Sequence, residues 1–205
     1  MSNLQTEIES ALKEIAHGWT TPNKAMMLAS AVIALRPKIS LEVGVWSGKG
    51  LISLALAHKY VGGGMVYGID PYSAAASAEG QENPEDKKWW SEVDHEMIYK
   101  LAQENILKYG CQNVCQLIRK KSSEFVPPDG IGVLILDGNH GDEAVSDIKH
   151  YAPSVAIGGL MFADDIAWTG GAVSKGIALL PKMGFKELYR IENKDENFGV
   201  FQKIK

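Results

Sequence analysis

The residues best suited to chemistry in this chain are a group of glycines and a set of acids that follow apolar runs. Residues 41–50 read Leu-Glu-Val-Gly-Val-Trp-Ser-Gly-Lys-Gly, and the apolar-rich segment 51–57 that follows is typical of a helix. A strand that turns through glycines into a helix places backbone amides and the positive helix end beside an open pocket. Asp70, twenty residues after Gly50, ends the next predicted strand, which contains the run 66–69. An acid at this position can accept hydrogen bonds from ribose hydroxyls. Together the two segments predict a crevice that binds a nucleoside.

The spacing of the glycines distinguishes this segment from two phosphate-binding motifs. A dinucleotide fingerprint has glycine two positions after the first, but that position holds Trp46, whose bulk would block a pyrophosphate. A P-loop has four residues between its glycines, followed by Lys and Ser or Thr, whereas three residues separate Gly44 from Gly48. Neither phosphate motif fits this chain.

The arrangement Leu-Glu-x-Gly-x-x-x-Gly from Leu41 to Gly48 resembles motif I of the class I S-adenosylmethionine-dependent methyltransferases. The resemblance is greatest to the branch that contains catechol O-methyltransferase and the macrocin-type sugar O-methyltransferases, and it extends from about residue 20 to the C-terminus. It implies S-adenosyl-L-methionine as the cofactor. It also implies that the reaction is methyl transfer to a hydroxyl group of a small molecule.

The resemblance further implies which residues contact the cofactor, position by position. Glu42 would approach the methionine amino end, glycines would let the backbone pass close to the cofactor, and Asp70 would bind the ribose. The short polar pair after the third strand would contact adenine, although Lys121 replaces the glycine that usually precedes it. The implied cofactor-binding residues are Glu42, Gly44, Gly48, Asp70, Ser122, Ser123 and Asp137.

Acids at the ends of the next two expected strands match the divalent-metal site of the same family. Asp137 follows the apolar run 133–136, and Asp164 and Asp165 follow the run at 160–163. The resemblance implies that these three carboxylates hold Mg²⁺ or a similar ion, which would activate the acceptor hydroxyl. The alternatives are a helix N-cap for Asp137 and a solvated pair of loop acids for the other two.

His140 lies three residues after Asp137, where catechol O-methyltransferase has a lysine that acts as general base and the sugar-modifying relatives have histidine. The resemblance therefore assigns His140 and Asp137 to catalysis, with His140 removing the acceptor proton. Histidine suits this role because its unperturbed pKa lies near neutrality. The other histidines lack such neighbours and are expected at the surface: His17, His58, His95 and His150.

Alternating strands and helices must position these residues. Hydrophobic periodicity and turn signals predict strands at 40–44, 65–70, 114–119, 132–136, 158–163, 185–190 and 198–201. Helices are predicted at 3–16, 22–35, 48–58, 91–109, 141–151 and 172–180. This alternation predicts an α/β fold with a Rossmann-like, doubly wound, mostly parallel sheet of seven strands and helices on both faces. The last two strands, joined by the polar turn 193–197, are expected to form a C-terminal antiparallel hairpin.

We interpret residues 1–205 as a single methyltransferase domain, in which 1–38 supply the N-terminal helices. Residues 72–95 form a long connection after the second strand, and long connections in compact domains are often functional. Because this connection contains Trp89 and Trp90, we expect a lid or a substrate-pocket insertion. The alternative is that the two tryptophans attach the segment to the core or to a second copy in a homodimer.

Two other tryptophans are expected near the ligands. Trp19 lies before the helix that leads into the first strand, where relatives close over the cofactor, and Trp168 lies three residues after Asp165 beside two glycines. Trp168 is therefore a candidate wall of the acceptor pocket. A place in the core is the alternative for both.

The composition is that of an ordinary globular protein, with 45% hydrophobic and 22% charged residues. The net charge of −4 argues against binding to a nucleic-acid backbone, and no apolar run is long enough for a membrane span. Cys111 and Cys115 have no nearby metal-ligand partners, so we expect reduced thiols in a cytoplasmic protein.

Three other interpretations stay open on the sequence alone. One is a metal-independent methyltransferase, whose activity would survive a chelator. Another is a non-catalytic regulatory or interaction protein, which would bind S-adenosylmethionine tightly without turnover. A dehydrogenase is disfavoured by Trp46, and measurable NAD binding would revive it.

Overall fold

The structure is a computed structural model that describes residues 2–79, 81, 83–139, 141–167 and 171–205. His140 and Trp168, which the sequence analysis singled out, lie outside the described residues. The α-helices are α1 (Ser2–Glu14), α2 (Pro22–Leu35), α3 (Lys49–Val61), α4 (Ala74–Ala78), α5 (Pro84–Glu92), α6 (His95–Lys108), α7 (Asp142–Tyr151) and α8 (Ala172–Ile177). The strands are β1 (Ile39–Val43), β2 (Met65–Ile69), β3 (Cys115–Ile118), β4 (Ile131–Leu136), β5 (Val155–Asp164), β6 (Phe185–Glu192) and β7 (Asn197–Lys203). Short 3₁₀ helices lie at Ser122–Glu124, Ala152–Ser154 and Leu180–Met183.

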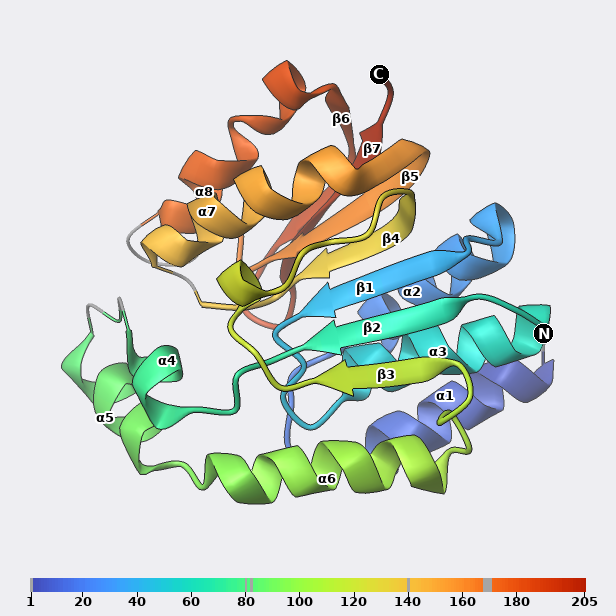
Figure 1. The fold of residues 1–205 in the computed structure, drawn as a ribbon, viewed down its shortest axis with the longest axis horizontal. Coiled ribbons are helices and arrows are strands. Elements are labelled where there is room, and N and C mark those ends of the chain that lie inside the picture. The colour runs from blue at the N-terminus through green and yellow to red at the C-terminus, as the bar shows by residue number, and fades with distance from the viewer. Residues whose placement is uncertain (1, 80, 82, 140, 168–170) are drawn as a thin grey trace.

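The strands form one sheet in the order β3-β2-β1-β4-β5-β7-β6 (Figure 1). Strands β1 to β5 run parallel, whereas β7 pairs antiparallel with both β5 and β6. The predicted mostly parallel, seven-stranded sheet with a C-terminal antiparallel hairpin is therefore confirmed. The chain leaves β1 through β2 and β3 and then returns to β4 on the other side of β1. Open α/β sheets bind ligands at the carboxyl ends of the strands beside such a reversal.

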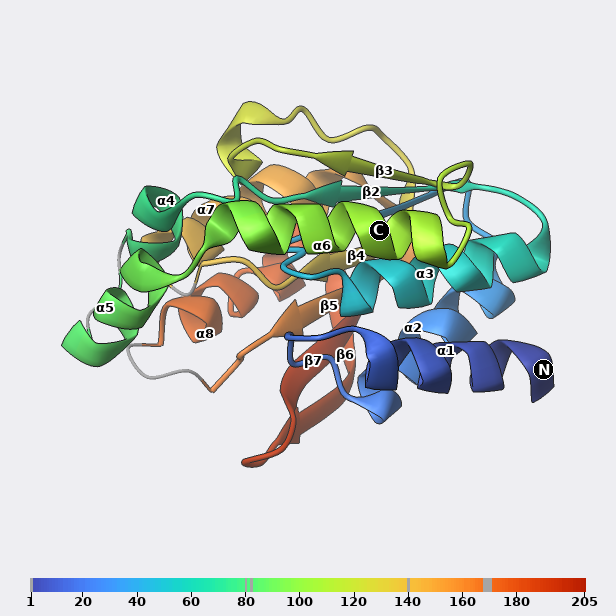
Figure 2. The ribbon, with the colours of Figure 1, turned by 90° about the horizontal axis from the view of Figure 1, so that it is seen from below.

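Helices cover both faces of the sheet, as the apolar central strands require. All six residues of β4 are buried, which is typical of a parallel strand between two helical layers. Apolar residues of α1, α2, α3 and α6 form one core layer, and those of α7 and α8 form part of the other. Figure 2 shows these helices from below. The first layer also encloses His58, whose ring nitrogens lie 2.8 Å from Ser40 Oγ and 2.9 Å from the Gly63 carbonyl. The prediction of a surface position is therefore wrong for His58, and also for His95, which is buried at the start of α6.

Helix α2 begins as the sequence predicted. Thr21 Oγ1 accepts a hydrogen bond of 3.1 Å from the Lys24 amide, and Pro22 occupies the first helical position. The helix ends where Arg36 adopts a left-handed conformation with φ of 44°. None of the described helices is both long and apolar enough to span a membrane.

The connection 72–95 contains the two short helices α4 and α5, which the sequence analysis did not predict. Both begin at polar N-caps, because Ser73 and Asn83 accept hydrogen bonds from amides in the first turns. Helices of five and nine residues are too short to show a clear hydrophobic period. In Figure 1, α4 and α5 lie beyond the carboxyl ends of the strands, on the side of the expected crevice. The proposed role of this segment as a lid stays a prediction.

Candidate active site at the carboxyl ends of the strands

A pocket of about 790 Å³ lies at the carboxyl ends of β1, β2, β4 and β5. This volume is in the range of pockets that hold a cofactor or a drug-sized ligand. The pocket walls come from the loop before α2, the glycine loop after β1, the 72–95 connection and the turn between β6 and β7. Most of the residues that the resemblance assigned to the cofactor or metal line it: Glu42, Gly44, Asp70, Ser122, Ser123, Asp137, Asp164 and Asp165.

The glycine loop after β1 lies directly against the end of β4. A Cβ atom at Gly44 would lie 1.9 Å from the backbone oxygen of Asp137, and φ of Gly44 is +84°, so glycine is required there. Gly48 precedes α3 with φ of +97° and is the N-cap of that helix. The first glycine of the loop therefore packs against the residue that follows β4, and Gly48 starts α3.

Glu42, the last acid of β1, is buried at the back of the pocket with 2% of its surface exposed. Gly50 makes room for it, because a Cβ at Gly50 would lie 2.1 Å from Glu42 Oε1. Glu42 Oε2 has no hydrogen-bond partner among the described residues. Burial, and then the negative charge of Asp137, raise the pKa of Glu42 well above its ordinary value. A buried carboxyl with an unpaired oxygen fits a ligand that brings a hydrogen-bond donor or an ammonium group.

Asp70 fixes the shape of the glycine loop. Its Oδ2 accepts hydrogen bonds of 3.0 Å from the amides of Val45 and Trp46, and its Oδ1 accepts one of 2.8 Å from the amide of Tyr72. Trp46 and Tyr72 have φ of 54° and 47°, a left-handed conformation that bulky residues rarely adopt. The carboxylate thus stabilises two strained residues, of which Trp46 lines the pocket, and the sequence did not indicate this role. The predicted contact of Asp70 with ribose stays a prediction.

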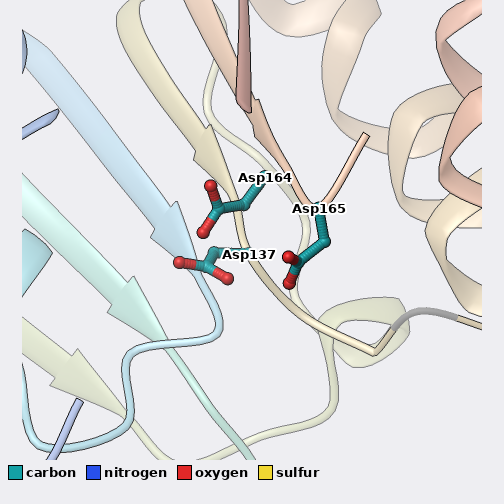
Figure 3. Close-up of side chains that lie close together, drawn as sticks. All are labelled: Asp137, Asp164 and Asp165. Carbon is teal, nitrogen blue, oxygen red and sulfur yellow. The ribbon is translucent and has the colours of Figure 1, made fainter. Parts of the chain in front are cut away.

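The three acids of the expected metal site lie together at the ends of β4 and β5 (Figure 3). Asp137, Asp164 and Asp165 each offer one carboxylate oxygen, and these oxygens lie within 4.8 Å of one another. Asp165 adopts φ of 51°, and its amide donates a 2.7 Å hydrogen bond to the Asn197 carbonyl of β7. The antiparallel strand therefore helps to turn Asp165 toward the other two acids. Asp137 is not a helix N-cap, because Gly141 caps α7.

Lys24 of α2 also belongs to this group of acids. Its Nζ donates hydrogen bonds to Oδ2 of Asp137 at 3.0 Å and to Oδ2 of Asp164 at 2.6 Å, and only 4% of the residue is exposed. Although burial opposes its charge, the two carboxylates raise the pKa of Lys24 above its ordinary value. Burial and the charge of Asp137 raise the pKa of Asp164. The sequence analysis missed Lys24, although its spacing of four residues before the buried Leu28 placed it on the core-facing stripe of α2.

The predicted adenine side of the pocket contains a second residue that the sequence analysis missed, an acid. Asp147 of α7 is buried, lines the pocket and accepts a hydrogen bond from the Ser122 side chain. Burial raises the pKa of Asp147 to about 6. Nearby, the Tyr151 hydroxyl donates to the Ser122 carbonyl at 2.7 Å and holds the 3₁₀ helix in place. The sequence did not indicate a role for Asp147, because α7 has the alternation of polar and apolar residues that is typical of a surface helix, and an acid on such a helix is expected in solvent.

The turn between β6 and β7 contributes to the pocket through Glu196. Its carboxylate accepts hydrogen bonds from the Thr21 hydroxyl and, at 2.9 Å, from Asn23 Nδ2. These bonds attach the hairpin to the first turn of α2, next to Lys24. The sequence predicted the turn but gave no reason to place it at the site.

Comparisons with known proteins agree with this arrangement. A family model described as a methyltransferase domain matches residues 41–166, from β1 to just beyond the acid pair. No curated protein sequence matches the chain significantly.

Several solved structures share the whole fold. An SAH-bound methyltransferase from Podospora anserina has a TM-score of 0.68 at 13% identity, covering 100% of this chain and 89% of that one. An O-methyltransferase from Bacillus cereus in complex with SAH has a TM-score of 0.66 at 11% identity, with 100% and 91% covered. A SAM-dependent O-methyltransferase from Thermotoga maritima has a TM-score of 0.65 at 16% identity, with 97% and 71% covered. At these identities the likeness shows a common fold.

Proposed function

The chain belongs to the methyltransferase-domain family, and we propose that it transfers a methyl group from S-adenosylmethionine to a hydroxyl of a small molecule, assisted by a divalent cation. The observation that carries this proposal is the triad Asp137, Asp164 and Asp165, which lies in the same pocket as the glycine loop and Glu42. Family membership confirms the resemblance on which the expectation was based. The hydroxyl acceptor and the cation are the parts that we add.

The residues around the glycine loop fit the proposed cofactor. S-adenosylmethionine would supply the methyl group as an activated sulfonium. Glu42 would hold the cofactor's ammonium group, because its buried Oε2 lacks a partner among the described residues. The related folds from Podospora anserina and Bacillus cereus are bound to SAH, which supports S-adenosylmethionine as the cofactor. Asp70 would hold the ribose with the lone pairs that its three amide contacts leave free.

The donor set of the acid triad fits a hard cation such as Mg²⁺, which prefers carboxylate oxygens. Lys24 bonds to Oδ2 of Asp137 and of Asp164, so a bound cation would share these two carboxylates with the lysine. A bound divalent cation would supply Lewis-acid activation of the acceptor hydroxyl. The carboxylates would fix the direction in which that hydroxyl faces the donor, and such alignment can supply much of the rate enhancement.

The proton of the acceptor would pass to His140, which the resemblance assigned as the general base. His140 lies outside the described residues, so this role rests on its position three residues after Asp137. The small-molecule acceptor, the cytoplasmic location and a homodimer likewise remain part of the proposal.

A metal-independent methyltransferase is the second candidate, and the position of Lys24 favours it. The buried ammonium group already neutralises part of the charge of Asp137 and Asp164. In that version the lysine would be the only cation that the reaction needs.

Calorimetric titration of SAH, followed by methyl transfer from labelled S-adenosylmethionine to a panel of hydroxylated acceptors, tests the proposal. We expect SAH to bind with or without chelator, and turnover to stop in chelator and return with Mg²⁺. Asp164→Asn and Asp165→Asn should abolish turnover but preserve SAH binding, and Asp129→Asn, at an exposed loop, should change neither. Full turnover in chelator would favour the metal-independent version. Absence of SAH binding would overturn both.

A further inference from the structure

Four tryptophans from three separate segments meet at the mouth of the pocket. Trp19 comes from the loop before α2, Trp46 from the glycine loop, and Trp89 and Trp90 from α5, and all four line the pocket. The distances between their ring centroids run from 4.8 Å for Trp89 and Trp90 to 6.4 Å for Trp19 and Trp90. The tryptophan cluster, as we call these four residues, is therefore one continuous aromatic surface rather than four isolated side chains.

Much of this aromatic surface faces outward. Trp19 is 67% exposed and Trp89 is 45% exposed, although indole rings are costly to leave in water. Trp46 Nε1 is buried and has no hydrogen-bond partner among the described residues. The strained left-handed backbone of Trp46 is fixed by Asp70, so the indole is directed into the cluster at a cost to the free protein. Exposed apolar surface beside a pocket is typical of a binding site.

A carboxylate accompanies the indoles. Asp86 lies three and four residues before Trp89 and Trp90 on α5, so the three side chains share one face of that helix. Asp86 lines the pocket, and its carboxylate has no ion-pair or hydrogen-bond partner within the part of the chain that the structure describes. Aromatic faces beside an uncompensated carboxylate attract cations through both the ring quadrupole and the charge.

The pocket as a whole is lined by more acids than bases, so its charge is negative like that of Asp86. Among the described residues, eleven carboxylic acids and four lysines line it. Burial raises the pKa of four of these acids (Glu42, Asp70, Asp147 and Asp164), but the seven others still outnumber the four lysines. The remaining field attracts a positively charged acceptor and repels an anionic one such as a phosphate or a carboxylic acid.

We propose that the tryptophan cluster and Asp86 bind a positively charged amino group of the methyl acceptor, either protonated or quaternary. The acceptor would then be a hydroxylated amine, with its hydroxyl at the acid triad and its cation against the indole faces. This inference rests on the proposed methyltransferase function, whose acceptor class it narrows. It also gives the 72–95 connection a role, because α5 supplies two of the four indoles and the carboxylate.

Three probes with the same catechol ring and different charge test the proposal: dopamine, 4-ethylcatechol and 3,4-dihydroxyphenylacetate. Each is titrated calorimetrically into protein saturated with SAH and Mg²⁺, so that the cofactor brings no sulfonium of its own. We expect dopamine to bind about tenfold more tightly than 4-ethylcatechol, and the anion to bind most weakly. Equal affinities, or no binding of any probe, would overturn the proposal.

Variants distinguish recognition of the acceptor's positive charge from apolar contact alone. Asp86→Asn and Trp89→Leu should lower dopamine affinity toward that of 4-ethylcatechol, while the affinity for 4-ethylcatechol itself changes less than about twofold. Glu85→Gln is the matched control, since Glu85 is exposed on the same helix and does not line the pocket. An equal loss for the charged and the neutral probe would show a wall without charge selection. If SAH does not bind, the proposed function fails first, and the order of the three probes in SAH-free protein still tests the cation site.

Discussion

The ammonium nitrogen of Lys24 lies 2.6 Å from Oδ2 of Asp164, a contact between the first turn of α2 and the end of β5. The same nitrogen lies 3.0 Å from Oδ2 of Asp137 at the end of β4. The N-terminal helices therefore contribute to the site as well as to the core, because α2 places the buried ammonium group of Lys24 beside the acid triad. Any divalent ion bound there must share two carboxylates with this lysine.

Replacement of Lys24 by methionine should lower the free energy of unfolding by about 3 kcal/mol in chelator, because the carboxylates of Asp137 and Asp164 lose their common partner. Urea denaturation at neutral pH measures this loss. Mg²⁺ should restore more stability to the variant than it adds to the wild-type protein, since the ion then replaces the missing charge. Lys49→Met is the control, because the Lys49 ammonium group donates to a neutral carbonyl, that of Gly18, at 3.1 Å. An identical effect of Mg²⁺ on wild type and Lys24→Met would argue against a cation site at the triad.

Replacement of Gly50 by alanine should disturb Glu42, because the new Cβ would lie 2.1 Å from Glu42 Oε1. We expect a loss of about 1–3 kcal/mol in unfolding free energy from overpacking. We also expect SAH to bind at least about tenfold more weakly, which corresponds to about 1.4 kcal/mol. Gly63→Ala is a matched control, because nothing lies within 4 Å of the corresponding Cβ position. Unchanged SAH affinity in Gly50→Ala would remove Glu42 from the cofactor site.

The sheet and the acid triad could be predicted from the sequence because each depends on local signals that repeat along the chain. Apolar runs ending in Asp70, Asp137 and Asp164 marked three strand ends, and parallel strands bring their carboxyl ends to one edge. The start of α2 was equally readable, since Thr21 and Pro22 carry a strong N-cap signal.

The residues that the sequence did not reveal act through contacts between distant segments. In the sequence, Lys24 resembles any other lysine on a helix. Its role becomes visible only in the fold, where the ends of β4 and β5 place two carboxylates beside it. Trp19 and Trp46 meet only because the loop before α2 and the glycine loop converge, with a centroid distance of 5.7 Å. His58 was expected at the surface because sequence patterns do not show that α3 is covered on nearly every side.

Replacement of Asp70 by asparagine should loosen the glycine loop as well as weaken the predicted ribose contact. The side-chain amide has one acceptor oxygen, so it cannot accept from Val45, Trp46 and Tyr72 as the carboxylate does. We expect SAH affinity to fall by at least about tenfold, equivalent to about 1.4 kcal/mol, as measured by calorimetry. Trp46 should gain mobility, visible as a red shift of the intrinsic fluorescence. Wild-type affinity in Asp70→Asn would mean that neither the ribose contact nor the loop geometry depends on the carboxylate.

Asp147 should make stability depend on pH in a defined direction. Burial raises its pKa in the folded protein to about 6, whereas an unfolded aspartate titrates near about 3.9. Between these values the unfolded chain has lost the proton that the folded protein still holds, so raising the pH through this window favours unfolding. A shift of about two pH units corresponds to a penalty of about 3 kcal/mol, fully present above about pH 6 and absent below about pH 4.

Comparison of Asp147→Asn with the wild-type protein isolates this effect, because all other groups titrate alike in both. The unfolding free energy of the variant relative to wild type should rise by up to about 3 kcal/mol between pH 4 and pH 7, measured by urea denaturation at both values. Asp129→Asn, at an exposed position, should show no such change with pH. A pH-independent difference for Asp147→Asn would mean that the pKa of this carboxyl is the same in the folded and the unfolded protein. The hydrogen bond from Ser122 would then cancel the effect of burial.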